Sequence, residues 1–93
     1  MNIKLIPIKK NNEYKKLKKA YLFSNSIGIN TTAFEIYSLC DGNNDVQKIF
    51  LKMCEKYHPE TEEQKKEILS DTYECIENLK NGELIELEEA DEL

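Results

Sequence analysis

The chain has 93 residues, of which 40% are hydrophobic and 33% charged, and its formal net charge is −5. This length favours one domain over residues 1–93, because two domains would each have too little core to fold. The charge is unevenly distributed: residues 1–20 hold seven Lys and one Glu, a net of +6, and residues 21–93 hold six Lys and seventeen acids, a net of −11. Because the larger part is acidic and all thirteen cations are Lys, the composition argues against nucleic acid as a partner.

Cysteine and histidine usage argues against a structural metal site and against disulfides. Cys40, Cys54 and Cys75 form no paired-cysteine motif, and His58 is the single imidazole. We expect buried thiols in a reducing cytoplasm. No segment approaches the ~20 apolar residues of a membrane span, and the N-terminus lacks the features of a signal peptide. These observations predict a cytoplasmic protein with no membrane partner.

The first thirty residues predict strands. A short extended run reaches Pro7, which disfavours a central strand position. Residues 14–19 fit either a helical turn or a polar strand, and residues 20–23 fit a strand better. Ser24-Asn25-Ser26 is a turn signal, after which residues 27–29 alternate in hydrophobicity. The pattern predicts an antiparallel sheet of two or three strands.

From Asn30 onward the hydrophobic period becomes helical. Asn30 or Thr31 is a suitable N-cap for a first helix, which Asp41-Gly42 ends. Asp45 is the expected cap of a second helix, and His58-Pro59 its end. The apolar stripe of the first helix consists of Ala33, Ile36, Tyr37 and Cys40.

A third helix is expected to begin at Thr61 and to stop at Asn81-Gly82. Residues 84–87 can add a short strand, and the acidic tail 88–93 is predicted to be frayed. The predicted class is therefore α+β and winged-helix-like: an N-terminal two- or three-stranded antiparallel sheet followed by three helices.

The sequence offers few groups for catalysis. His58 stands at an interhelical loop, where an exposed side chain is the ordinary outcome. No nucleophile-elbow, zinc-protease or phosphate-loop motif occurs. The acids fall on helix exteriors, where a solvated face is the ordinary role. We therefore predict that the chain is not an enzyme and binds no cofactor or metal.

The segment Asn30-Thr-Thr-Ala-Phe-Glu-Ile-Tyr-Ser-Leu-Cys-Asp-Gly42 resembles the PqqD family, the recognition elements for precursors of ribosomally made, modified peptides. The similarity runs from about Ala20 to Ile85. The chain departs from the family pattern at Glu83, which stands between Gly82 and Leu84, and in the basic segment before Ala20. Further positions that match the family are Val46, Ile49, Tyr57, Asp71, Ile76 and Leu79.

The resemblance implies a peptide-binding domain that receives the leader segment of a precursor peptide and presents it to a modifying enzyme, often a radical SAM enzyme. An exposed sheet edge offers unpaired N–H and C=O groups to such a peptide. The strand at residues 27–29 is the expected edge, and the third helix is the expected opposite wall. The predicted peptide-binding residues are Ser26, Ile27, Gly28, Ile29, Lys65, Ile68, Leu69 and Thr72.

Plain alternatives exist for these residues and for the function. Ile68 and Leu69 fit core packing equally well, because one amphipathic stripe serves either purpose, and Lys65 fits a solvated surface role. A winged-helix DNA-binding regulator shares this order of elements, although its third helix would then offer six acids to the DNA groove. A general protein-interaction adaptor differs from a leader-binding domain only in its partner.

Overall fold

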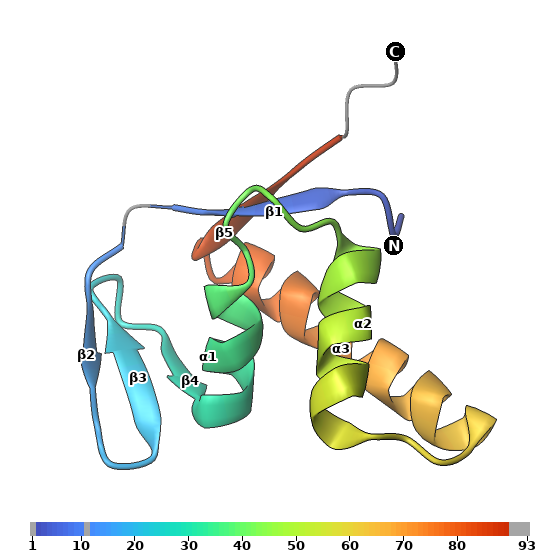
Figure 1. Cartoon of the computed structure of the whole chain (residues 1–93). Coiled ribbons are helices and arrows are strands. Elements are labelled where there is room, and N and C mark those ends of the chain that lie inside the picture. Colours follow the sequence, from blue (N-terminus) through green and yellow to red (C-terminus); the bar gives the residue numbers. More distant parts are fainter. Residues whose placement is uncertain (1, 11, 90–93) are drawn as a thin grey trace.

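The computed structural model describes residues 2–10 and 12–89, and this part of the chain is α+β. Two antiparallel sheets lie against three helices, which confirms the predicted fold class (Figure 1). Residues 14–16 form a strand, so the hairpin sheet has three strands, the larger of the two predicted numbers. The elements are β1 (Ile6–Lys9), β2 (Tyr14–Lys16), β3 (Ala20–Phe23), β4 (Gly28–Asn30), α1 (Thr31–Ser38), α2 (Val46–Tyr57), α3 (Glu62–Asn81) and β5 (Ile85–Glu88).

The two sheets lie on different sides of the helices. β1 pairs with β5, so a strand from each end of the chain crosses one end of the helical layer (Figure 1). The other sheet has the order β2-β3-β4 and stands beside α1. Pro7 lies in the two-stranded sheet, opposite Leu87, where a missing N–H is tolerated. Only residues 88 and 89 of the predicted frayed tail lie within the described residues, and Glu88 belongs to β5.

Each helix begins at a side-chain cap that the sequence predicts. The side-chain oxygen of Asn30 accepts the Ala33 N–H at 2.8 Å, and that of Asp45 accepts the Lys48 N–H at 2.8 Å. Thr61 does the same for α3, accepting from the Gln64 N–H at 3.1 Å. Each cap satisfies a donor that the helix itself leaves unpaired, which contributes about 1 kcal/mol.

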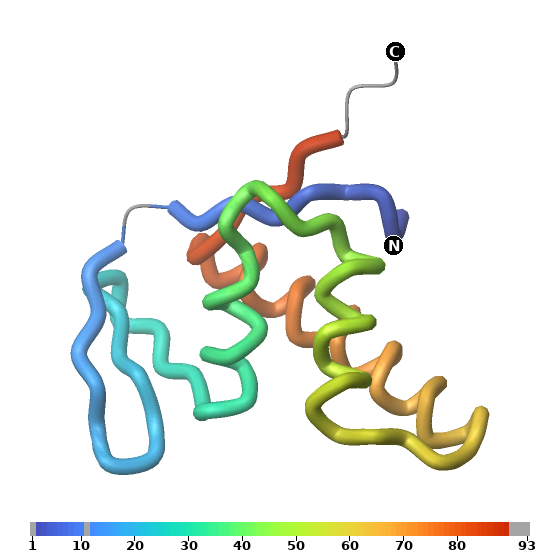
Figure 2. Tube along the Cα trace, viewed as in Figure 1, coloured from blue at the N-terminus to red at the C-terminus, as the bar shows by residue number. Residues whose placement is uncertain are grey.

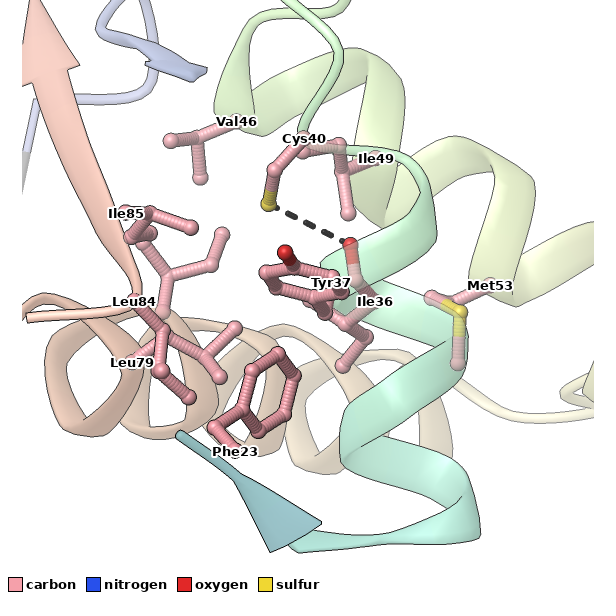
Figure 3. Close-up of a cluster of buried hydrophobic side chains, with 11 residues drawn as sticks. Phe23, Ile36, Tyr37, Cys40, Val46, Ile49, Met53, Leu79, Leu84 and Ile85 are labelled. Atoms are coloured by element: carbon pink, nitrogen blue, oxygen red, sulfur yellow. Dashed lines mark hydrogen bonds between the residues drawn. The ribbon is translucent and has the colours of Figure 1, made fainter. Parts of the chain in front are cut away.

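The core lies between the helices and is closed by β3 and β5 (Figure 3). The Cys40 thiol donates to the Ile36 carbonyl at 3.3 Å, so the polar edge of this small side chain is satisfied inside the core. Full burial of a large apolar side chain stabilises by about 1.5–3 kcal/mol. The buried apolar residues are Phe23, Ile36, Tyr37, Cys40, Val46, Ile49, Met53, Ile76, Leu79, Leu84 and Ile85.

The conformation at the end of α3 explains why Glu83 stands between Gly82 and Leu84. Glu83, not Gly82, takes the left-handed conformation, with φ 59°. The Leu84 N–H donates to the Leu79 carbonyl at 2.9 Å and the Glu83 N–H to the Lys80 carbonyl at 3.0 Å, the two bonds of a Schellman motif. From this turn the chain runs directly into β5 (Figure 2). Gly82 itself has a negative φ and stands at a close approach: a Cβ there would lie 3.3 Å from the Asn78 carbonyl oxygen and 3.4 Å from the Ile27 side chain.

Candidate functional site

The third strand of the hairpin sheet has one free edge. β4 pairs with β3 in the register Ala20↔Asn30, Tyr21↔Ile29 and Leu22↔Gly28, and the sheet order places β4 at its margin. Within the described residues, no further strand pairs with β4 on its outer side. An edge of this kind presents main-chain groups in the spacing that an added strand needs.

The hydrogen-bond pattern identifies the groups that point outward from β4. The Phe23 N–H donates to the Ile27 carbonyl at 2.8 Å, which makes Phe23 and Ile27 a hydrogen-bonded pair. Opposed residues in an antiparallel ladder alternate between bonded and non-bonded pairs. Leu22↔Gly28 is therefore non-bonded, and the N–H and C=O of Gly28 point away from β3. The same alternation directs the Asn30 N–H outward.

A groove separates this edge from α3. Its volume is about 570 Å³, and Ile36 of α1 forms part of its apolar lining. One wall belongs to β4 and the start of α1, the other to the middle and end of α3. The groove is lined by Ile27, Gly28, Ile29, Asn30, Thr32, Ala33, Ile36, Asp71, Glu74, Cys75, Asn78 and Leu79.

Side-chain contacts fix the position of the hairpin relative to α3 and α1. Asn25, in the turn before β4, donates from Nδ2 to the Gly82 carbonyl at 2.8 Å. On the other side, the rings of Tyr21 and Phe34 stack with centroids 3.6 Å apart and planes 5° from parallel, which fixes β3 against α1. The hairpin is thus tied to the C-terminus of α3 and to α1, which holds β4 beside the helix.

A second pocket continues the groove toward the N-terminus of α3. It has a volume of about 510 Å³ and shares Thr32, Ile36 and Asp71 with the groove. Met53 and Tyr57 of α2 give it an apolar wall. The remaining lining residues are His58, Pro59, Glu60, Gln64, Glu67, Ile68 and Thr72.

The combined lining of groove and pocket is acidic. It contains Glu60, Glu67, Asp71 and Glu74, and it contains no Lys. All four acids are exposed. Ion pairs in the described part of the chain join Lys56 with Glu35 and Lys65 with Glu62, so none of the four lining acids is paired there.

The predicted peptide-binding residues lie in three different hollows, except for two that line none of them. Ile27, Gly28 and Ile29 line the groove. Ser26 lies at the turn with φ 71° and borders a shallow hollow on the β2–β3 side instead. The fifth position, Lys65, is exposed and pairs with Glu62 at 3.7 Å, outside both linings.

The other three predicted residues belong to the first half of α3. Ile68 and Thr72 line the second pocket. Thr72 is 1% exposed, and its hydroxyl donates to the Ile68 carbonyl at 2.7 Å, so its polar group is already satisfied. Leu69 is half-buried and lines neither hollow.

Sequence reasoning missed the α3 residues that face β4 directly. Asp71, Glu74, Cys75 and Asn78 form this wall. Their i, i+3, i+4, i+7 spacing marks one helix face, but a face that mixes acids, a thiol and an amide has no apolar stripe to reveal it. The sequence could have indicated this face only through its position next to the buried apolar stripe of α3.

The thiols near this region are poor nucleophiles. Burial, with a smaller contribution from the neighbouring charge of Glu74, raises the pKa of Cys75 to about 11. Burial also raises the pKa of Cys40 to about 12. Among residues 2–10 and 12–89, no three His, Cys, Asp or Glu side chains gather as a metal-binding group. Nor does any helix of that part have the length and apolar character needed to cross a membrane.

Comparison with known proteins returns no relative: no family model, curated protein or solved structure matches the chain. The local resemblance to the PqqD family therefore remains an expectation from the sequence.

Proposed function

We propose that this chain binds the leader segment of a ribosomally synthesised precursor peptide by β-strand addition and presents it to a modifying enzyme, a radical SAM enzyme. The observation that supports the proposal best is the free edge of β4 facing α3 across a groove. The PqqD resemblance supplies the class of peptide and of enzyme. In this proposal the chain acts in the cytoplasm as a binding module and performs no chemistry itself.

The geometry supports strand addition at β4. An incoming extended peptide pairs with the outward N–H and C=O of Gly28 and with the outward N–H of Asn30. Its side chains on one face then lie beside Ile27 and Ile29, which line the groove and pack against the core. Main-chain pairing gives affinity that is independent of sequence, and the groove supplies selectivity.

The direct test is an NMR titration of the labelled chain with the precursor peptide encoded beside its gene. We expect chemical-shift changes in residues 26–30 and 64–76. Changes confined to the Lys-rich residues 9–19 would contradict strand addition. For the presenting role, the neighbouring radical SAM enzyme is assayed on the same precursor, and we expect modification to depend on adding this chain.

DNA binding is the rival proposal, supported by the winged-helix-like order of elements and by the exposed Lys residues of the β2–β3 hairpin. The third helix opposes it, since Glu62, Glu63, Glu67, Asp71, Glu74 and Glu77 are all exposed on its surface. Acids at those positions repel phosphates. A gel shift with duplex DNA at physiological salt separates the two proposals: we expect no salt-sensitive complex.

A further inference from the structure

The groove proposed to bind the leader carries negative charge, and this limits the peptides that can bind there. If the chain binds an extended peptide as proposed above, its ligand must lie along α3, where Glu67, Asp71 and Glu74 border the path. No Lys lines either hollow to balance them. Each acid is exposed before binding and becomes partly desolvated when a peptide covers it, so an acidic ligand would add repulsion to that cost.

The path is longer than β4. From Gln64 to Asn78, α3 spans about 21 Å at ~1.5 Å per residue, the length of about six extended residues at ~3.3 Å each. β4 has three residues and pairs with about half of such a segment. The groove and the second pocket meet at Thr32, Ile36 and Asp71, so the hollow continues where β4 ends.

The chemistry of the second pocket differs from that of the strand edge. Met53 and Tyr57 supply apolar surface, and Ile36 is shared with the groove. No sheet edge lies in its lining, so side-chain burial and charge must provide the affinity there. Glu60 and Glu67 lie in the same lining.

We propose that the ligand is a basic, amphipathic leader segment of about six residues, which pairs with β4 at one end and inserts an apolar side chain into the Met53–Tyr57 pocket at the other. Its Lys or Arg residues face Glu67, Asp71 and Glu74. This inference rests on the proposed function and narrows it to one class of peptide. Charge complementarity with the groove is its basis.

The test uses three acetylated seven-residue peptides that alternate Val with Lys, with Glu or with Gln. Binding is followed by NMR on the folded chain at low salt. We expect the Lys peptide to bind at least tenfold more tightly than the Glu peptide, with the Gln peptide between them. We also expect shifts both at Gly28 and at Met53. Binding of the Gln or Glu peptide as tightly as the Lys peptide would overturn the charge assignment.

Matched variants separate groove charge from overall charge. The double variant Asp71→Asn, Glu74→Gln removes two groove acids, and Glu63→Gln, Glu77→Gln removes two acids of α3 that lie outside both linings. We expect the first to weaken Lys-peptide binding about 3- to 10-fold, as two partly exposed pairs would, and the second to change it less than twofold. Equal losses in both variants would show a non-local charge effect and reject the inference.

The pattern of shifts distinguishes failure of this inference from failure of the proposed function. If the three peptides perturb Gly28 and Asn30 equally, strand addition stands and the basic-ligand inference is wrong. Should the shifts end at Asp71 and leave Met53 and Tyr57 unperturbed, the second pocket is not part of the path. When none of the peptides perturbs β4, both the inference and strand addition are contradicted.

Discussion

Replacing Gly28 by Pro removes one outward donor from the edge of β4 and leaves the β3–β4 ladder bonds in place. The Gly28 N–H points away from β3, and Pro is tolerated where a strand's N–H faces outward. Gly28 does not have a positive φ, and proline is tolerated on the edges of sheets. We expect the free energy of unfolding to change by no more than about 1 kcal/mol.

The effect on peptide binding is expected to be larger. A peptide carbonyl opposite Gly28 loses its donor and meets the proline Cδ instead, and an unsatisfied buried carbonyl costs about 1–3 kcal/mol. This corresponds to a loss of affinity of about 5- to 150-fold. The assay is isothermal calorimetry with the precursor peptide, with circular dichroism and thermal melting to confirm the fold.

Gly28→Ala is the matched control. A Cβ at this position meets no atom closer than the Tyr21 carbonyl oxygen at 4.0 Å, and the N–H is retained. We expect near-normal affinity and a stability equal to or slightly above that of the parent. The reasoning is refuted if folded Gly28→Pro binds within twofold of the parent, or if both variants lose affinity equally.

Three further predictions concern stability and the groove. Asn25→Ala removes the hydrogen bond between the hairpin and α3, so it should lower the free energy of unfolding by about 1 kcal/mol and also weaken peptide binding. The control Asn12→Ala loses a comparable 2.9 Å bond to the Glu83 carbonyl and should lower stability alone, so equal losses of affinity in the two variants would contradict the prediction. Glu83→Gly should raise the free energy of unfolding by about 0.5–1 kcal/mol, because Glu83 has φ 59° and Gly adopts this left-handed conformation without a Cβ penalty. Urea unfolding measures the change, and a loss of stability would contradict the assignment of Glu83 to the C-terminal cap of α3. Burial raises the pKa of Cys40 from 9.0 to about 12, so its contribution to the free energy of unfolding is full below pH 9 and falls by up to about 1.4 kcal/mol per pH unit as pH rises toward 12. Cys40→Ala should reduce the slope of the free energy of unfolding against pH in this alkaline range. An unchanged slope would contradict the raised pKa.

The helices were predictable from the sequence because their signals are local. Asn30, Asp45 and Thr61 each accept a backbone N–H within three residues, so a cap is visible without knowledge of the fold. The apolar period of the first helix similarly identified Ile36, Tyr37 and Cys40 as core. Such features depend on contacts within one turn or one face of a helix.

The strand pairing and the groove wall depend on contacts far apart in the sequence. β1 pairs with β5 across the whole chain, and no local pattern in residues 6–9 specifies that partner. Lys65 and Leu69 were predicted at the groove because α3 was expected to form its wall, but the Asn25 side chain donates to the Gly82 carbonyl and so holds the hairpin beside the C-terminal half of the helix. That contact joins a hairpin to a helix end, and one sequence does not reveal it.

A peptide strand that pairs with the outward edge of β4 must accept a hydrogen bond from the Gly28 amide. Hydrogen exchange at this amide is to be measured by NMR with and without saturating precursor peptide. We expect the Gly28 amide to be unprotected in the free chain and strongly protected in the complex, together with that of Asn30. If a peptide binds while both amides continue to exchange at their free rates, the ligand does not add to β4, and the proposed strand addition is contradicted.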